Sequence, residues 1–238
     1  MKKTTPSLSL VEKTDLLSVN EWVYKTLRKS IMCGEIRPGS ALTIRGLAEC
    51  LEVSPMPVRE ALRKLVSEAA VEIKDNRRVT VPLISPEKFK SLFALRTLLE
   101  THAAETALPY FTTEKIAELE QLDVAVDEAY SCGDVVAGSL ANQAFHRFIY
   151  VQDPNQLILP MIESVWLQLG PFVRIGLSQL EQYYKYDRHQ EAIEALRQRD
   201  AFALRRAIES DIRDGLSMIR NVDQIYENLK AKSSPTSN

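Results

Sequence analysis

Apolar residues recur at helical intervals from the first part of this chain onward. In residues 18–33 they follow one another at steps of four, which places on one helical face Val19, Val23, Leu27 and Ile31. Ser18 with Glu21 three positions later has the pattern of a capping box, so a helix is predicted to begin there. Gly34 is expected to end it, and the RPGS stretch at 37–40 is expected to form a turn.

Two further short helices are predicted next. Thr43 can cap the first of them, and its inward positions are Leu47, Ala48 and Leu51. The other begins in the stretch VSPMPVREAL, where Ser54 can cap and Pro55 takes the first helical position. Pro57 also lies in the first turn, whose N–H groups have no partner within the helix. The two prolines therefore fix the start of this helix, and its inward stripe is Val58, Ala61, Leu62 and Leu65.

The next pattern is that of a hairpin. VEIK and VTV alternate and flank DNRR at 75–78, which predicts two strands with a basic tip. Three short helices followed by such a hairpin make a winged helix-turn-helix domain over residues 18–84, an architecture typical of DNA reading. The pattern alone leaves open a small α+β domain with incidental surface charge.

The spacing of apolar residues predicts helices throughout residues 86–222. Ser85 can cap the first helix, with Pro86 at its first position, and the later helical stretches are 113–131, 134–151, 156–178, 183–198 and 200–222. Six helices of this length predict an antiparallel bundle over residues 85–225, with room for a ligand between helices. The predicted fold is mainly α, and flexible tails are expected at 1–17 and 226–238.

The distribution of charge supports two modules of different kinds. Residues 1–85 hold 14 Lys and Arg against 10 Asp and Glu, whereas the remainder holds 16 against 22. The near-neutral total of −2 therefore hides a basic, polyanion-binding head joined to an acidic partner module.

Several classes of protein are disfavoured. No apolar run approaches the roughly 18 residues that a membrane helix needs, and the N-terminal MKKTTPSLSL lacks the apolar core of a signal peptide. The three cysteines make no close pair, which fits a reducing cytoplasm. Neither a Gly-rich phosphate loop nor a Ser/His/Asp motif is present. We therefore expect a cytoplasmic protein that is not an enzyme and has no membrane partner.

The stretch from Val23 to Leu65 resembles the winged-helix domain of the GntR family of bacterial transcription regulators. The shared motifs are I-x-x-G-x-I-x-P-G-x-x-L, L-A-x-x-L-x-V-S and P-V-R-E-A-L-x-x-L. The resemblance implies DNA contacts from the second helix, the start of the recognition helix and the wing. At matching positions this chain has Arg45, Ser54, Met56, Pro57, Arg59, Arg77 and Arg78.

The chain departs from the family pattern at two of these places. Pro55 stands where the family usually has arginine, and Arg78 stands where the wing tip usually has glycine. The operator sequence is therefore expected to differ from the usual one. We interpret Arg63 and Lys64 as solvated helix residues in preference to DNA contacts.

The second half resembles the FCD ligand-binding domain of the FadR-type branch of this family. Its marks are Arg96-x-x-x-Glu100, Phe145-His146 with a polar residue four places before the histidine, Asn155, and His189. Many members hold a divalent metal with one aspartate and three histidines. The matching positions here are Asn142, His146, His189 and Asp211, so two ligands match and two depart.

Spacing alone is a weak signal for such a site, since it shows only that Asn142 and His146 share a helix face. With the resemblance, two imidazoles and a carboxylate would suit Zn²⁺, Ni²⁺ or Mn²⁺, and the alternative is a polar pocket that has lost its metal. By resemblance, Arg96 would grip a ligand carboxylate, against the alternative of a surface i,i+4 pair with Glu100. Asn155, Trp166 and Arg174 are further candidate ligand-binding residues, although core packing explains Trp166 equally well.

The resulting hypothesis is a ligand-responsive transcription regulator, expected to be a repressor with activation as the alternative. It would bind a palindromic operator in double-stranded DNA as a homodimer, because one winged helix supplies few contacts, and would respond to a small carboxylate. One alternative is a metal-sensing regulator. Another is an all-α metal-dependent hydrolase, which needs a general base that no motif supplies.

Overall fold

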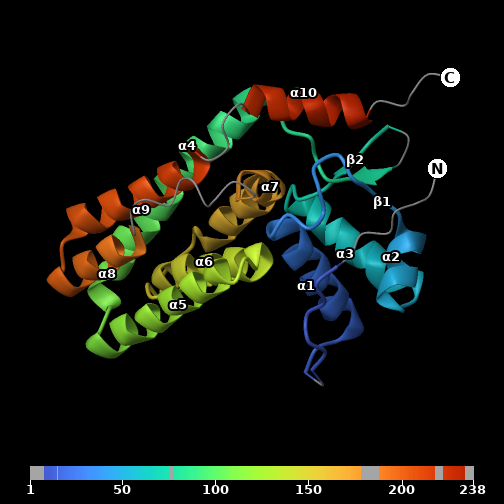
Figure 1. Cartoon of the computed structure of the whole chain (residues 1–238). Helices are drawn as coiled ribbons and strands as arrows, with labels where there is room; N and C mark the ends of the chain where they lie inside the picture. Colours follow the sequence, from blue (N-terminus) through green and yellow to red (C-terminus); the bar gives the residue numbers. More distant parts are fainter. Residues whose placement is uncertain (1–7, 15, 76–77, 178–187, 218–221, 234–238) are drawn as a thin grey trace. The chain divides into compact units, whose positions relative to one another are not determined.

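The computed structural model of the 238-residue chain describes residues 8–14, 16–75, 78–177, 188–217 and 222–233 (Figure 1). The chain divides into two compact units. The first comprises Met1–Phe89, Trp166–Phe172 and Asn221–Asn238, and the second comprises Lys90–Val165 and Val173–Arg220. The mainly α fold predicted from the sequence is confirmed.

The first unit contains a winged helix-turn-helix. Its helices are α1 (Val19–Met32), α2 (Ile44–Leu51) and α3 (Pro55–Ser67), and its strands are β1 (Ala41–Leu42), β2 (Glu72–Ile73) and β3 (Val79–Thr80). The helices pack through most of the apolar positions that the sequence predicted, and the side chains with no exposed surface include Val23, Leu27, Ile31, Val58 and Leu65. Val19 was predicted on the same face, but it is the first residue of α1 and is 52% exposed. Burial of these stripes is the main stabilising contribution to so small a unit.

The predicted helix starts are confirmed. Ser18 and Glu21 form a capping box, and the Thr43 hydroxyl accepts a hydrogen bond from the N–H of Gly46. Ser54 occupies the N-cap position of α3, but its side chain makes no capping hydrogen bond. An N-cap side chain accepts from the second or third helical N–H, and Pro57 at the third position has none.

The wing differs from the predicted two-stranded hairpin. β3 pairs antiparallel with β2 and also with β1, so the sheet has three strands in the order β1-β3-β2. In this register Leu42 of β1 lies opposite Val79. β1 was not predicted, because two residues are too few to show an alternating pattern.

Both expected tails include residues with defined contacts or structure. Residues 9–13 lie against the first helix: the N–H of Val11 donates to Thr26 Oγ1 at 3.3 Å, and the carbonyl of Val11 accepts from Trp22 Nε1 at 2.7 Å. Ser9 donates its backbone N–H to Glu35 at 3.0 Å. At the other end, α10 (Val222–Ser233) continues through most of the stretch expected to be a tail from residue 226.

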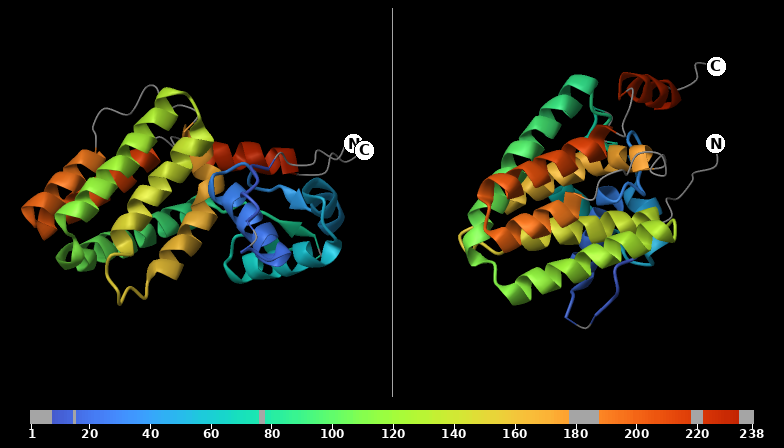
Figure 2. Two further views of the ribbon diagram at one scale, coloured as in Figure 1. Left: turned by 90° about the horizontal axis from the view of Figure 1, so that it is seen from below. Right: turned by 60° about the vertical axis from the view of Figure 1, so that its left-hand side comes forward.

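The remaining elements are helices. They are α4 (Pro86–Ala107), the short 3-10 helix η1 (Leu108–Tyr110), α5 (Thr113–Ser131), α6 (Val135–Tyr150), α7 (Leu159–Leu177), α8 (Arg188–Gln198) and α9 (Ala201–Ser217). In the second unit α5 and α6 lie side by side, as do α8 and α9, and α5 also contacts α8 (Figures 1 and 2). Residues 183–187, predicted to begin the α8 helix, lie outside the described residues. No helix in the described ranges has the length and apolar character needed to span a membrane.

Two glycines permit close approach of helices. At Gly138 of α6 a Cβ would lie 2.4 Å from the ring of Tyr130 on α5, so the α5–α6 contact needs a residue without a side chain. Within the first unit, a Cβ at Gly170 of α7 would lie 2.1 Å from the carbonyl oxygen of Met32 at the end of α1. This second obstacle is backbone, which cannot turn away as a side chain can.

Candidate functional site

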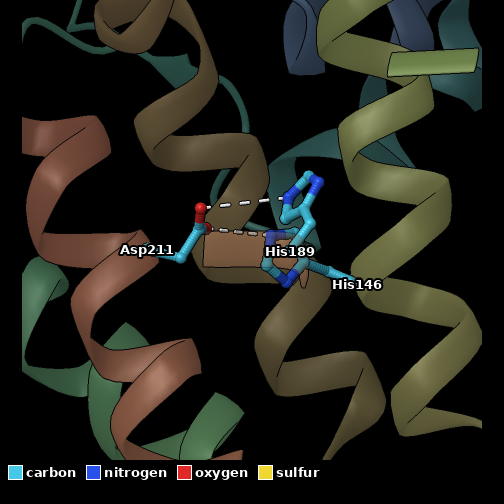
Figure 3. Close-up of side chains that lie close together, drawn as sticks. All are labelled: His146, His189 and Asp211. Atoms are coloured by element: carbon cyan, nitrogen blue, oxygen red, sulfur yellow. Dashed lines mark ion pairs between the residues drawn. The ribbon is translucent and has the colours of Figure 1, made fainter. Parts of the chain in front are cut away.

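Three of the predicted metal ligands meet inside the second unit. His146 projects from α6, His189 from α8 and Asp211 from α9, and their ligand atoms all lie within 4.8 Å of one another (Figure 3). Nε2 of His146 lies 3.0 Å from Oδ2 of Asp211, and Nε2 of His189 lies 3.9 Å from Oδ1 of the same carboxylate. We refer to these three residues as the His/Asp cluster.

A second layer of polar groups surrounds the two imidazoles. Nδ1 of His189 lies 2.7 Å from Oδ1 of Asp123, which is buried on α5. Nδ1 of His146 lies 3.3 Å from the hydroxyl of Tyr150, and that hydroxyl lies 2.8 Å from Oε2 of Glu100. Nδ1 of each imidazole therefore contacts a neighbouring side chain, and Nε2 of each lies near the carboxylate of Asp211.

The charge of the cluster is concentrated on Asp211. Burial acts to raise the pKa of this carboxyl, but the contact with His146 and the nearby His189 and Arg96 outweigh it, so the pKa lies well below its usual range. Asp211 is therefore an anion at neutral pH. It faces two imidazole nitrogens in a buried setting, where a negative charge needs a compensating cation.

This donor set fits a divalent transition metal. Two imidazole nitrogens and one carboxylate oxygen make a common protein set for Zn²⁺, with a further position open. Nε2 of His146 is buried and makes no hydrogen bond within the described part of the chain, despite its closeness to Asp211. A metal ion would satisfy that nitrogen. Asn142 lies one turn before His146 on α6 and is half-buried, and its part as a fourth ligand stays a prediction.

Arg96 and Glu100 do form an i,i+4 pair on α4, but the pair is not on the helix surface. Nε of Arg96 lies 2.6 Å from Oε1 of Glu100, and the side chains are 14% and 0% exposed. Burial acts to lower the pKa of Arg96, yet the negative charge of Glu100 raises it overall. A ligand carboxylate that reached Arg96 would therefore share the guanidinium with Glu100.

The other predicted ligand-binding residues are scattered. Asn155 is exposed in the turn after α6, where its N–H donates to Asp153 Oδ1 at 2.8 Å. Trp166 is buried and belongs to the first unit, whereas Arg174 belongs to the second. Nη1 of Arg174 is buried without a hydrogen-bond partner in the described ranges, so an anion could satisfy it. The ligand-binding roles of these residues stay predictions.

Most of the predicted DNA-contacting residues lie on the surface of the first unit. Arg45 is 90% exposed beside Glu49, and Met56 is 59% exposed at the start of α3. Ser54, Arg59 and Arg78 are also exposed. Pro57 is buried in α3, which disfavours its predicted DNA contact, and Arg77 lies outside the described residues.

Two neighbouring basic residues have partners on their own unit. Nη1 of Arg63 lies 3.0 Å from Oε1 of Glu60, and the ammonium of Lys64 lies 3.7 Å from the ring centroid of Tyr24. Contacts of this kind agree with the interpretation of Arg63 and Lys64 as helix-surface residues.

Known proteins resemble this chain over both units. Residues 20–81 match the family described as "Bacterial regulatory proteins, gntR family", and residues 91–214 match the FCD domain. The HTH-type transcriptional regulator McbR of Escherichia coli K12 is 31% identical over 155 residues, which are 65% of this chain and 70% of McbR. This chain belongs to the GntR family, in the branch that carries an FCD domain.

Other GntR regulators extend the likeness over almost the whole chain. The gluconate operon transcriptional repressor of Bacillus subtilis is 24% identical over 225 residues, covering 86% of this chain and 90% of the repressor. The solved structure of E. coli McbR/YncC superimposes with a TM-score of 0.76 at 26% identity, covering 90% of this chain and all of that one. The protein is therefore a transcription regulator and not an enzyme, and the hydrolase alternative is not favoured.

Two residues of this GntR regulator's site were missed in the sequence analysis. Asp123 approaches His189 from another helix and far away in sequence, so no local pattern could have revealed it. Tyr150 follows His146 by four positions on α6, and this spacing could have suggested a contact.

Proposed function

We propose that this regulator binds a palindromic operator as a homodimer and holds one divalent metal per subunit at the His/Asp cluster. The metal would leave an open coordination position for the carboxylate of a small organic acid, with Arg96 binding the acid's far end. The observation that carries this proposal is the meeting of His146, His189 and Asp211 from three helices. The sign of regulation is proposed as repression, as in the name of the gluconate operon repressor.

The part of each unit follows from its chemistry. A basic winged helix supplies phosphate and base contacts, and two copies are needed because one presents few of them. The second unit would respond to the acid, and the binding of acid would change how tightly the dimer holds DNA. The cytoplasm, where bacterial DNA is found, is the proposed location.

The metal is tested by elemental analysis of protein purified without chelator and without a nickel column. Wild type should carry about one Zn, Ni or Mn per subunit, and the His146→Ala/His189→Ala double variant should carry none. His102→Ala is the matched control, because this third histidine is exposed on α4. Wild-type protein that holds no metal, even after zinc is added back, would refute the metal site.

A metal sensor is the second candidate, because Asp211 and two imidazoles could bind a metal that is itself the signal. Operator binding measured during separate titrations with zinc and with citrate as a probe acid separates the two. A response to zinc alone, from metal-free protein, would favour the sensor. A response to citrate at constant metal loading would favour the proposed acid-responsive regulator.

A further inference from the structure

We propose that Asp123 and Tyr150 are positioning residues that fix both histidines of the cluster as the Nδ1–H tautomer. Both Nε2 atoms then present lone pairs toward Asp211. The inference rests on the proposed metal site, and it assigns to two residues outside the ligand set the task of preparing that site.

Asp123 on α5 orients the ring of His189. This side chain is 3% exposed, and its Oδ1 lies 2.7 Å from Nδ1 of His189. An ionised carboxylate can only accept hydrogen bonds, so the proton between them belongs to Nδ1. Oδ2 of Asp123 accepts from Nε2 of Gln190 at 2.7 Å, and with both oxygens engaged the carboxylate is held in one orientation.

The tautomer of His146 depends on the phenolic proton of Tyr150. The hydroxyl of Tyr150 lies 2.8 Å from Oε2 of Glu100 and 3.3 Å from Nδ1 of His146. Glu100 is paired with Arg96 and offers only acceptors, so Tyr150 donates its proton to Glu100. The phenolic oxygen therefore acts as the acceptor in its contact with His146, and Nδ1–H of His146 is the donor.

Both histidines then present the same ring nitrogen, Nε2, to Asp211. With protons on both Nδ1 atoms, the Nε2 atoms of neutral His146 and His189 are lone-pair donors, 3.0 Å and 3.9 Å from the oxygens of Asp211. Three electron-pair donors at such distances repel one another unless a cation lies between them. The ring of Phe145 stacks on His189 with centroids 3.9 Å apart and limits rotation of that imidazole. The cluster is thus arranged for a metal before any metal arrives.

A purely structural role is the competing explanation. The Asp123–His189 contact could serve only to join α5 to α8, and Tyr150 could serve only to satisfy Glu100. Loss of stability would follow from either role. Because the Asp123–His189 contact fixes a tautomer in either role, zinc affinity is the observable that a purely structural role leaves unchanged.

The direct test is ¹⁵N NMR of histidine-labelled, metal-free protein, at a pH where the imidazoles are neutral. In wild type, His146 and His189 should both carry the proton on Nδ1. Asp123→Asn should give a mixture of tautomers at His189, because one amide oxygen must then serve two donors. Tyr150→Phe should do the same at His146. Asp127→Asn, an exposed position on α5, and Tyr110→Phe, exposed in η1, are the matched controls and should leave both tautomers unchanged.

The second measurement is zinc affinity, by competition with a chromophoric chelator. Removing an outer partner of a ligating histidine weakens metal binding by about 10–100-fold, and this is the loss expected for Asp123→Asn and for Tyr150→Phe. The two control variants should bind zinc as wild type does. The wild-type NMR spectrum tests the inference even where a variant fails to fold.

The outcomes separate this inference from the proposed function. Wild type with Nε2–H histidines, or variants with unchanged tautomers, would overturn the inference even if zinc still binds. Variants with wild-type zinc affinity would overturn it as well. Wild type that binds no zinc would refute the metal site alone. In that case the NMR spectra decide the positioning roles: shifted tautomers in the two variants would support them, and unchanged tautomers would overturn them.

Discussion

Glu100 and Arg96 form an ion pair that solvent hardly reaches, one turn apart on α4, with Nε of the arginine 2.6 Å from Oε1 of the glutamate. Glu100 also accepts the phenolic proton of Tyr150, which in turn contacts His146. A residue expected to bind the effector is therefore joined through Glu100 to the predicted metal ligand.

Arg96→Ala should lower the free energy of unfolding by about 3–5 kcal/mol, because it leaves the buried charge of Glu100 without its partner. The measurement is urea unfolding at neutral pH. Arg147→Ala is the matched control: its pair with Glu163 is half exposed on the arginine side, and such pairs contribute about 0–1 kcal/mol. Equal losses in the two variants would mean that the Arg96–Glu100 pair is not held in a buried setting.

The stability of the metal-free protein should fall with acid in a way that depends on Asp211. The folded-state pKa of this carboxyl lies well below its usual value near 3.9, so its stabilising effect is complete above that value. As the pH falls below about 4, Asp211 becomes protonated in the unfolded chain while it stays ionised in the folded chain. The free energy of unfolding therefore declines. Unfolding measured from pH 6 downward should give a shallower decline for Asp211→Asn than for wild type. Parallel curves for the two proteins would contradict the depressed pKa.

Arg59→Ala should weaken operator binding by about 1–3 kcal/mol per subunit, the typical discrimination of a base contact. Arg59 is exposed near the start of α3, where side chains of a recognition helix reach DNA. Arg63→Ala, on the same helix but paired with Glu60, is the control and should bind nearly as wild type does. Fluorescence anisotropy at one fixed salt concentration gives both affinities. Equal affinity of Arg59→Ala and wild type would remove Arg59 from the interface.

Arg78→Ala should weaken binding to every DNA sequence alike and reduce the salt slope by about 1. The reason is that Arg78 is exposed beside β3 in the wing, where a cation meets phosphates and carries no sequence information. Affinity for operator and for unrelated DNA, each over a range of salt, provides the measurement. A change of specificity at constant salt slope would instead indicate that Arg78 reads the minor groove.

Gly170→Ala should destabilise the protein by about 1–3 kcal/mol or more, since the added carbon would lie 2.1 Å from the carbonyl oxygen of Met32. Gly215→Ala makes the same chemical change in a helix where nothing lies within 4 Å, and it should stabilise by up to about 1 kcal/mol. Thermal unfolding compares the two. Changes of the same sign would show that the approach of α7 to α1 is looser than described.

Local signals account for what the sequence could predict. The capping box at Ser18 and the proline at the start of α3 lie within one helical turn of the structure that they specify, so the helix starts were predictable. The pairing of β1 with β3 and the contact of Val11 with Trp22 join segments that no spacing rule connects. They depend on tertiary packing, which overrides weak local preferences.

In the candidate site too, some residues could be predicted from the sequence and others depended on how the helices pack. His146 and His189 could be proposed because a family resemblance assigned their positions, and the geometry brings them together with Asp211. Asp123 was not predicted, because its contact with His189 depends on how α5 packs against α8. The burial of the Arg96–Glu100 pair was likewise missed, since i,i+4 spacing is the same on a solvent-facing helix and on a covered one.

Residues 9–13, which lie against α1, cover a tryptophan whose fluorescence can report on their position. Trp22 is 3% exposed, its indole N–H donates to the carbonyl of Val11 at 2.7 Å, and the ammonium of Lys13 lies 4.2 Å from its ring centroid. The chain has only two tryptophans, so Trp166→Phe would leave Trp22 as the single tryptophan, which can be excited selectively at wavelengths that tyrosine does not absorb. Release of residues 9–13 would admit water to the indole and move its emission to longer wavelength. The intrinsic fluorescence of the DNA-binding head would then report, without an attached dye, whether this segment stays in place when the operator binds.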